Sequence, residues 1–278
     1  MAKFAAIQMA SGPNVDANLN EALRLIKDAT KNGAELIVLP ENFAHMGIND
    51  ADILSLAEDQ NNPGDILNFL SSTAKKLGIW ILGGTVPLKT KDEKKILSAS
   101  ILYNSEGEIA CSYNKIHLFD VDLAEDRGAY KESAFTQTGN ELSVYNSPFG
   151  KLGLAICYDL RFPEMFRSLE KQGMQILLLP ASFTSITGKA HWEVLNRARA
   201  IENLCYVVSS AQGGYHVNGR ETHGDSMIVD PWGKIIDHLP KGSGYVIAEL
   251  DLKQLNKTRE NFPVLNHRKL FCNFTEIR

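Results

Sequence analysis

The stretch LGLAICYDLRFPE, from Leu152 to Glu164, decides how the rest of the chain is interpreted. It begins with an apolar run that predicts a short buried strand. The run breaks at Cys157, and Pro163 stands where a helix can begin, because proline is tolerated in the first helical turn. Cys157 is therefore predicted at a tight strand-to-helix turn, which lifts a side chain off the sheet edge beside backbone N–H groups. The alternative is a cysteine that only packs in the core.

The composition is typical of a globular protein, with 44% hydrophobic and 22% charged residues among 278. A formal net charge of -4 argues against a nucleic-acid-binding surface. No apolar run is long enough to span a membrane, and the opening MAKFAAIQMA resembles neither a signal peptide nor a transit peptide. The widely spaced Cys111, Cys157, Cys205 and Cys272 favour reduced thiols. We expect a cytoplasmic protein without nucleic-acid or membrane partners.

Apolar segments alternate with amphipathic ones along the chain. Strands are predicted at residues 4–9, 35–39, 79–82, 98–103, 108–113, 175–179, 206–211, 226–230 and 245–250. Helices are predicted at 16–31, with Asp16 as its cap, and at 65–77, 164–172 and 191–203. Residues 114–147 are polar and weakly periodic, so an irregular segment is expected there. Because helices alternate with strands and hairpins occur, the fold class is α/β with mixed sheets, in a single domain spanning 1–278.

One internal repetition accompanies this alternation. The segment from Lys31 to Glu41 resembles the segment from Lys171 to Ala181, half the chain later. Both begin Lys-x-Gly and continue into an apolar strand that ends Leu-Pro. Two similar halves packed together would explain the repetition; a chance match between helix–glycine–strand joints is the alternative.

Two charged residues follow strand ends. Glu41 comes after Leu39-Pro40, where a carboxylate would project from a sheet edge, and Lys115 follows the strand ending at Tyr113. Taken singly, such residues are usually solvated. None of the seven histidines can be assigned to Cys157 as a base, because such partners meet only in space, and the papain-like signature CGSCW is absent. The absence of HExxH, CxxC and a P-loop pattern argues against metal and phosphate sites.

Three stretches together resemble the motifs of the nitrilase superfamily of carbon–nitrogen hydrolases. They are LPE at 39–41, YNKIHLFD at 113–120 and GLAICYDLRFPE at 153–164, in matching order and spacing, and the resemblance extends to about His267. It implies a four-layer αββα sandwich of two mixed β-sheets and no cofactor. It also implies a homodimer or higher homo-oligomer, and a catalytic triad of Glu41, Lys115 and Cys157.

The resemblance also implies a mechanism, two-step amide hydrolysis through a thioester. Glu41 would take the Cys157 proton, and the thiolate would attack the amide carbonyl. Lys115 and the backbone N–H of Tyr158 would hold the oxyanion. Glu41 would then protonate the leaving group and activate water to break the thioester. Glu132 matches a second glutamate often found beside the triad in the superfamily, although Glu125 lies nearby in the sequence.

The second half of the chain bears on the substrate. The stretches from Ser182 to Val208 and from His223 to Gly233 resemble the branch of the superfamily that acts on small carboxylate-bearing α-keto amides. Deaminated glutathione is the expected substrate, hydrolysed to the free acid. The alternatives are α-ketoglutaramate or another small linear amide, a non-catalytic scaffold and, with less support, a nitrile.

A substrate with carboxylates needs cations in its pocket. Arg161, four positions after the cysteine, is the first candidate, followed by Arg127 and Arg220 in polar loops. For Arg161 a structural ion pair with Asp159 or Glu164 is the alternative. Three residues that follow the strand at 175–179 are expected to line the same pocket: Ser182, Phe183 and Thr184.

Overall fold

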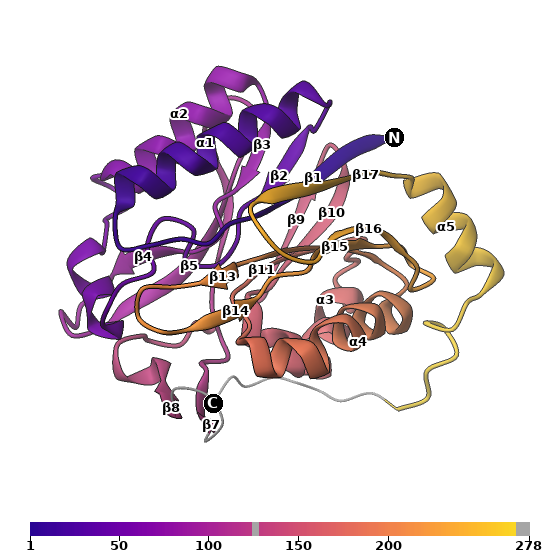
Figure 1. Cartoon of the computed structure of the whole chain (residues 1–278). Coiled ribbons are helices and arrows are strands. Elements are labelled where there is room, and N and C mark those ends of the chain that lie inside the picture. Colours follow the sequence, from indigo (N-terminus) through magenta and orange to yellow (C-terminus); the bar gives the residue numbers. More distant parts are fainter. Residues whose placement is uncertain (124–127, 271–278) are drawn as a thin grey trace.

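Two β-sheets face each other, and helices cover the outer side of each, in the computed structural model of residues 1–123 and 128–270 (Figure 1). The first sheet contains β1 (Ala2–Gln8), β2 (Leu36–Val38), β3 (Trp80–Leu82), β4 (Val86–Lys89), β5 (Ile96–Tyr103), β6 (Ile109–Asn114) and β17 (Gly244–Leu250). The second contains β9 (Ser143–Ser147), β10 (Gly150–Leu154), β11 (Ile176–Ala181), β12 (Tyr206–Ala211), β15 (Ser226–Val229) and β16 (Ile235–Leu239). Two short ribbons pair β7 (Asp120–Leu123) with β8 (Gly128–Lys131) and β13 (Gly213–Tyr215) with β14 (Glu221–His223).

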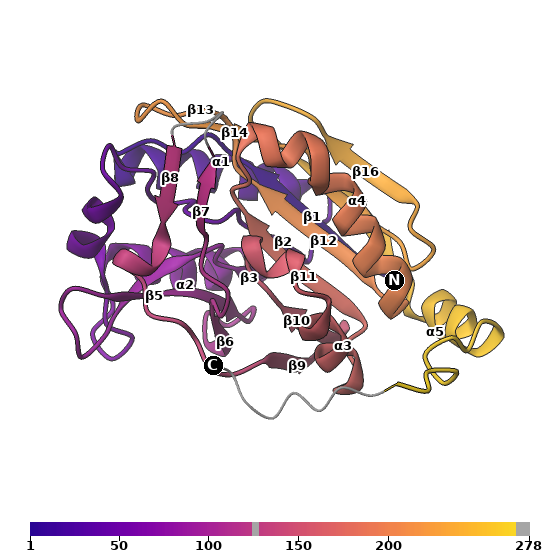
Figure 2. The ribbon, with the colours of Figure 1, turned by 90° about the horizontal axis from the view of Figure 1, so that it is seen from below.

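The helices form the two outer layers. The longer ones are α1 (Val15–Lys31), α2 (Asp65–Leu77), α3 (Pro163–Lys171), α4 (Ser185–Asn203) and α5 (Leu252–Asn261). Three 3-10 helices are η1 (Asp50–Leu56), η2 (Glu132–Ala134) and η3 (Cys157–Arg161). In Figure 1, α1 and α2 lie outside the first sheet, and in Figure 2 α3 and α4 lie in front of β10, β11 and β12. The predicted four-layer αββα sandwich is confirmed.

Both sheets are mixed, as predicted. The first has the order β17-β1-β2-β3-β5-β4, with β6 paired to β5, and only the β1–β2 and β2–β3 pairs are parallel. The second has the order β16-β15-β12-β11-β10-β9, with parallel pairs only between β10, β11 and β12. The parallel strands therefore occupy the middle of each sheet.

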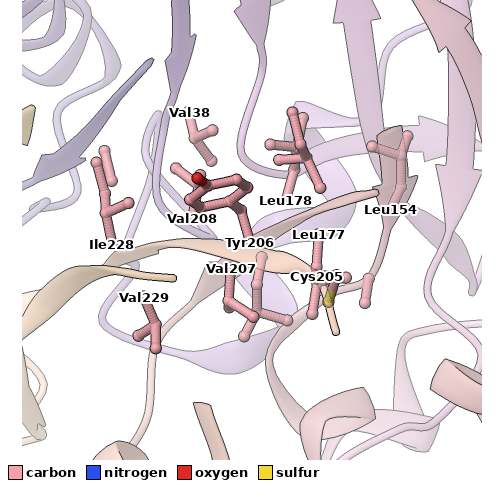
Figure 3. Packing of buried hydrophobic residues seen from close by; sticks show 14 of the residues in the cluster. Val38, Leu154, Leu177, Leu178, Cys205, Tyr206, Val207, Val208, Ile228 and Val229 are labelled. Carbon is pink, nitrogen blue, oxygen red and sulfur yellow. The ribbon is translucent and has the colours of Figure 1, made fainter. Parts of the chain in front are cut away.

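Alternation along the strands separates two hydrophobic cores. Phe4 and Ala6 of β1 belong to the core between the sheets, whereas Ala5 and Ile7 pack with α1 and α2. This follows from the two-residue period of a strand, which sends successive side chains to opposite faces. Figure 3 shows the same division in the second sheet, where Leu178 and Val208 point toward Val38 and their neighbours point away. The sheet–sheet core is thus built by both halves of the chain.

The internal repetition in the sequence corresponds to a repeated unit in the structure. The order β1-α1-β2-α2-β3 in the first half matches β10-α3-β11-α4-β12 in the second, and each set of three strands is parallel. The two copies of the repeated segment end in β2 and β11. Because neighbouring parallel strands end at the same edge of a sheet, residues that follow β10 and β11 lie close together, and the residue that follows β2 can meet them from the facing sheet.

Several boundaries differ from the sequence predictions. Asn14, not Asp16, caps α1, because its side chain accepts the Ala17 N–H. The helix predicted at 191–203 begins at Ser185, since Thr184 supplies the cap. The segment 114–147 contains β7, β8, η2 and β9, although weak periodicity suggested irregular structure. Also missed were β4, β13, β14, β16 and α5, all short or poorly alternating.

Within residues 1–123 and 128–270, no helix has the length and apolar character needed to cross a bilayer. Cys111, Cys157 and Cys205 are free thiols, whereas Cys272 lies outside the described residues.

Candidate active site

Cys157 stands at a sharp turn between β10 and η3. Its backbone has a φ of +47°, in the left-handed region that most side chains avoid. The residue is 6% exposed, and its sulfur accepts a hydrogen bond from the Ser182 N–H at 3.5 Å. Pro163 begins α3, as the sequence predicts. The predicted strand–turn–helix arrangement around the cysteine is therefore present, with the thiol held at the carboxyl edge of the second sheet.

Glu41 reaches the same place from the first sheet. It follows β2, and the chain turns sharply after it because Asn42 has a φ of +57°, a conformation that asparagine tolerates. Gly84 packs against the Pro40 carbonyl, where an added Cβ would lie 2.1 Å from the oxygen. The Glu41 carboxylate is buried, and its Oε2 accepts a hydrogen bond from the Ser182 hydroxyl at 2.5 Å. The Cys157 thiol lies near enough to this carboxylate for each group to affect the pKa of the other.

Lys115 lies between two carboxylates. It follows β6, and its Nζ donates to Glu41 Oε1 at 2.8 Å and to the two Glu132 oxygens at 3.0 and 2.9 Å. Glu132 begins η2 and also accepts the Phe119 N–H at 2.7 Å. Lys115 is 2% exposed, whereas the Glu132 side chain is 22% exposed. Glu41, Lys115 and Cys157 are thus brought together as predicted, with Glu132 beside them.

The protonation states of these groups follow from burial and proximity. Burial raises the pKa of the Cys157 thiol well above its usual value, and the Glu41 carboxylate adds to the effect. Burial alone would raise the pKa of Glu41, but the Lys115 ammonium and the Ser182 hydroxyl hold it below its ordinary value. Burial opposes the charge on Lys115, yet Glu132 and Glu41 keep its pKa well above normal. The resting site therefore contains a carboxylate, an ammonium and a neutral thiol.

Glu132 behaves differently from Glu41. Burial raises its pKa, and the nearby Glu41 carboxylate opposes its ionisation further, despite the favourable contact with Lys115. Two carboxylates around one ammonium compete for the same charge. Among the residues that the structure describes, no histidine hydrogen-bonds Cys157, whereas the Glu41 carboxylate is near enough to raise its pKa, so Glu41 is favoured over a histidine as its base.

A pocket of about 1090 Å³, partly open to solvent, contains this cluster. Four of the residues predicted to line it do so: Arg161, Ser182, Phe183 and Thr184; Tyr158, predicted as a backbone donor, lines it too. The ring of Tyr158 packs edge-on against Phe119, with centroids 5.1 Å apart. Arg127 lies outside the described residues. Within those residues, no group of three His, Cys, Asp or Glu side chains is placed to hold a metal ion.

Within the described part of the chain, two guanidinium groups line the pocket. Arg161 lies over the rings of Phe183 and Tyr158, at 5.1 and 5.7 Å from their centroids, and its Nη1 donates to His191 Nδ1 at 3.1 Å. The alternative of an ion pair with Asp159 or Glu164 is not what the structure has. Arg220, between β13 and β14, donates to the Ser182 carbonyl and stacks on Tyr130 at 5.4 Å.

Sequence reasoning missed the full part played by three polar residues. Ser182 was predicted only as a pocket residue, yet it contacts both Cys157 and Glu41. Gln212 is fully buried and its Nε2 donates to the Glu41 carbonyl at 3.0 Å. Asp159 is also fully buried and was considered only as a partner of Arg161. Ser182 and Gln212 could have been recognised as candidate site residues, because each is a polar residue directly after an apolar strand.

The fold and this cluster are those of a carbon–nitrogen hydrolase. Residues 3–260 match the profile of the carbon-nitrogen hydrolase family, so the chain belongs to that family, and the resemblance stated from the sequence is confirmed.

The similar proteins point the same way. The deaminated glutathione amidase of Synechocystis sp. is 44% identical over 267 residues, covering 95% of this chain and 97% of that protein. The Mus musculus protein of the same name is 42% identical over 269 residues, covering 95% of this chain and 82% of its own.

Solved structures agree on the fold. The C. elegans NitFhit protein superposes with a TM-score of 0.89 at 37% identity, covering 97% of this chain, which spans 66% of NitFhit. Nit3 of Saccharomyces cerevisiae, a member of branch 10 of the nitrilase superfamily, has a TM-score of 0.87 at 31% identity, with 97% of both chains covered.

Proposed function

We propose that the protein is an amidase that hydrolyses deaminated glutathione through a thioester on Cys157. The observation that carries the chemistry is the contact of Lys115 with Glu41, beside a buried thiol that accepts the Ser182 N–H while the Ser182 hydroxyl donates to Glu41. The names of relatives at 40–44% identity over nearly the whole chain support the substrate. The reaction needs a nucleophile, a base and a cation, and this cluster can supply all three.

The first step transfers the thiol proton to Glu41 as sulfur attacks the amide carbonyl. Because the thiol rests neutral and Glu41 rests ionised, general-base catalysis suits the site better than a preformed thiolate. Negative charge then develops on the carbonyl oxygen, where Lys115 and the Tyr158 N–H stabilise it. One well-placed donor of this kind contributes about 3–4 kcal/mol. Protonated Glu41 passes its proton to the leaving amine, and the C–N bond breaks.

The second step regenerates the enzyme. Water enters the space left by the amine, Glu41 takes its proton, and hydroxide attacks the thioester. The C–S bond breaks, the acid leaves and the thiol is restored. Glu132 binds the Lys115 ammonium through both carboxylate oxygens while Glu41 binds it through one, so two carboxylates hold the cation in place. The role of Glu132 is to orient the cation rather than to exchange protons with the substrate.

The two arginines fit the charges of this substrate. Deaminated glutathione carries one carboxylate on the keto-acid side of the scissile amide and another at the terminal glycine. Arg161 and Arg220 line one pocket with the thiol, and guanidinium groups match carboxylates well. α-Ketoglutaramate carries a single carboxylate and would need only one of them.

A substrate panel tests the proposal. Deaminated glutathione should release cysteinylglycine and 2-oxoglutarate, whereas α-ketoglutaramate and glutamine would release ammonia; a simple nitrile completes the set. We expect the highest kcat/KM with deaminated glutathione. A preference for α-ketoglutaramate would contradict the substrate assignment, and no hydrolysis of any amide would contradict the function.

Single variants refine the test. Arg161→Gln and Arg220→Gln should each raise KM for deaminated glutathione about tenfold or more, as expected for losing one charge-assisted contact. Arg24→Gln is the matched control, because Arg24 pairs with Glu21 on the exposed face of α1. Unchanged KM in both pocket variants would contradict their assignment to the carboxylates.

We also propose that the protein works in the cytoplasm as a homodimer or larger homo-oligomer. Free thiols suit a reducing compartment. Large apolar side chains are exposed on α4 and near it: Val194 at 66%, Ile201 at 47% and Trp232 at 66%. Light scattering coupled to size-exclusion chromatography should give at least twice the chain mass of 30.8 kDa, and a monomer would contradict this proposal.

A further inference from the structure

One buried carboxylate joins the two segments that carry the proposed nucleophile and the proposed oxyanion cation. Asp159 is fully buried in η3, two residues after Cys157. Its Oδ2 accepts the Ile156 N–H at 2.8 Å, directly before the nucleophile, and the Tyr113 hydroxyl at 2.7 Å. Its Oδ1 accepts the His117 N–H at 3.1 Å. The carboxylate therefore bridges the second sheet and the segment that follows β6.

The contacts on the Lys115 side flank that residue. Tyr113 precedes it by two positions and His117 follows it by two. The Tyr113 hydroxyl, while donating to Asp159, also accepts the Ile116 N–H at 3.1 Å. His117 Nδ1 lies 2.7 Å from Asp159 Oδ1, and its ring stacks on Phe162 at 3.8 Å. The backbone on both sides of Lys115 is thus held, directly or through the Tyr113 hydroxyl, by the two oxygens of the Asp159 carboxylate.

This carboxylate has no role in the proton transfers proposed above. Its position matches a different need, since the left-handed conformation of Cys157 persists only where surrounding contacts fix it. The Ile156 N–H bond fixes the chain directly before that strained residue. Burial and the Asp159 carboxylate raise the pKa of Tyr113 well above normal, so its hydroxyl remains a donor.

We propose that Asp159 is a positioning residue that sets the separation between the Cys157 sulfur and the Lys115 ammonium. Both are anchored to the same carboxylate through short backbone paths, so the oxyanion cation and the attacking atom move together. The inference rests on the proposed function for the roles of Cys157 and Lys115. Asp159 itself touches neither substrate nor reacting atoms.

Two variants loosen the link to different degrees. Asp159→Asn places an amide NH₂ where one carboxylate oxygen accepts hydrogen bonds, so one of these bonds is lost. If the sulfur and the ammonium are thereby displaced by roughly 1 Å, kcat should fall about 10²-fold. Tyr113→Phe keeps the carboxylate and removes one donor, so a loss of about tenfold is expected. KM should change little in either variant. Tyr206→Phe is the matched control, a buried tyrosine whose hydroxyl bonds the Asp251 backbone away from the site.

Alkylation of Cys157 by iodoacetamide separates positioning from stability. Followed at the Cys157 peptide by mass spectrometry, its rate reports the environment of that thiol without substrate, and circular dichroism checks that each variant is folded. Both variants should react more slowly per site. The double variant Tyr113→Phe/Lys115→Met should be alkylated at the same rate as Lys115→Met alone. Once the ammonium is gone, the contact between Tyr113 and Asp159 has no cation to position.

Losses that multiply in the double variant, or a lower melting temperature with unchanged kcat per site, would overturn the inference. A wild-type protein that hydrolyses none of the amides in the panel would overturn the proposed function instead. The alkylation rates would still test the role of Asp159, because they need no substrate.

Discussion

Cys157 combines a strained backbone with a buried, neutral thiol. Its φ of +47° costs an L-residue about 1–2 kcal/mol relative to the right-handed region. The sequence predicted the turn from an apolar run followed by Cys157 and Pro163. Glu41 and Lys115 also follow strands, but their place in the site was predicted from the resemblance to the nitrilase superfamily. The bond between Ser182 and Glu41 was beyond such reasoning, because it joins segments 141 positions apart.

The strain can be measured by comparing two inactive variants. Cys157→Ala and Cys157→Gly should both lose turnover because neither has a nucleophile. Glycine adopts a positive φ without strain, and this gain exceeds its extra chain entropy of about 0.5–1 kcal/mol. The glycine variant should therefore melt at the higher temperature in calorimetry. An alanine variant of equal or greater stability would show that the turn is not strained.

Lys115→Met tests the charge balance of the cluster. Without the ammonium, Glu41 and Glu132 face each other while buried, so stability at pH 8 should fall by about 3–5 kcal/mol. Repulsion raises the folded-state pKa of the pair above the unfolded value of about 4.3. The folded state then binds protons more tightly, so stability is greatest below the unfolded pKa and is lost as pH rises through the folded one.

Urea denaturation at pH 5 and pH 8 checks this sign. The variant should be closer to wild type at pH 5. Adding Glu132→Gln removes one of the two carboxylates and should weaken the pH dependence. A Lys115→Met variant that is equally destabilised at both pH values would refute the repulsion argument.

Among the elements, those with strong periodicity were predicted and those defined by tertiary contacts were not. The strand at 206–211 and the helix at 65–77 are present as β12 and α2. The β13–β14 ribbon was missed because residues 213–223 are rich in glycine and polar residues and lack alternation. Its position is set by α4, where an added Cβ on Gly188 would lie 2.2 Å from the His223 Cβ.

Gly188→Ala should therefore displace the ribbon that carries Arg220. The clash is with a Cβ, which cannot rotate away, so the backbone must shift. KM for deaminated glutathione should rise several-fold, whereas the rate of Cys157 alkylation should be unchanged. Gly12→Ala is the control, since no atom lies within 4 Å of its added Cβ. Equal KM values in both variants would show that the ribbon position does not affect binding.

At the scale of the whole molecule, the two sheets share one core and one site. Gln212 after β12 bonds the Glu41 carbonyl, and Gln8 of β1 accepts the Ser226 N–H of β15 at 2.8 Å. The internal repetition predicted two similar halves from sequence. It could not predict how they face each other, because that depends on the side chains that interlock between the sheets.

This shared core should make unfolding a single cooperative event. Calorimetry should give one transition with a ratio of van't Hoff to calorimetric enthalpy near one per cooperative unit. If the halves were independent, two transitions would appear, and the single-domain prediction would be contradicted.

The division of the site between two sheets also bears on protein synthesis. Glu41 and Lys115 leave the ribosome before Cys157, and the three side chains meet only when the two sheets pack together. A nascent chain therefore carries an ordinary thiol, unassisted by base or cation. Under the proposed mechanism Cys157 gains its base and its cation only when the fold is complete, so incomplete chains are expected not to hydrolyse amides.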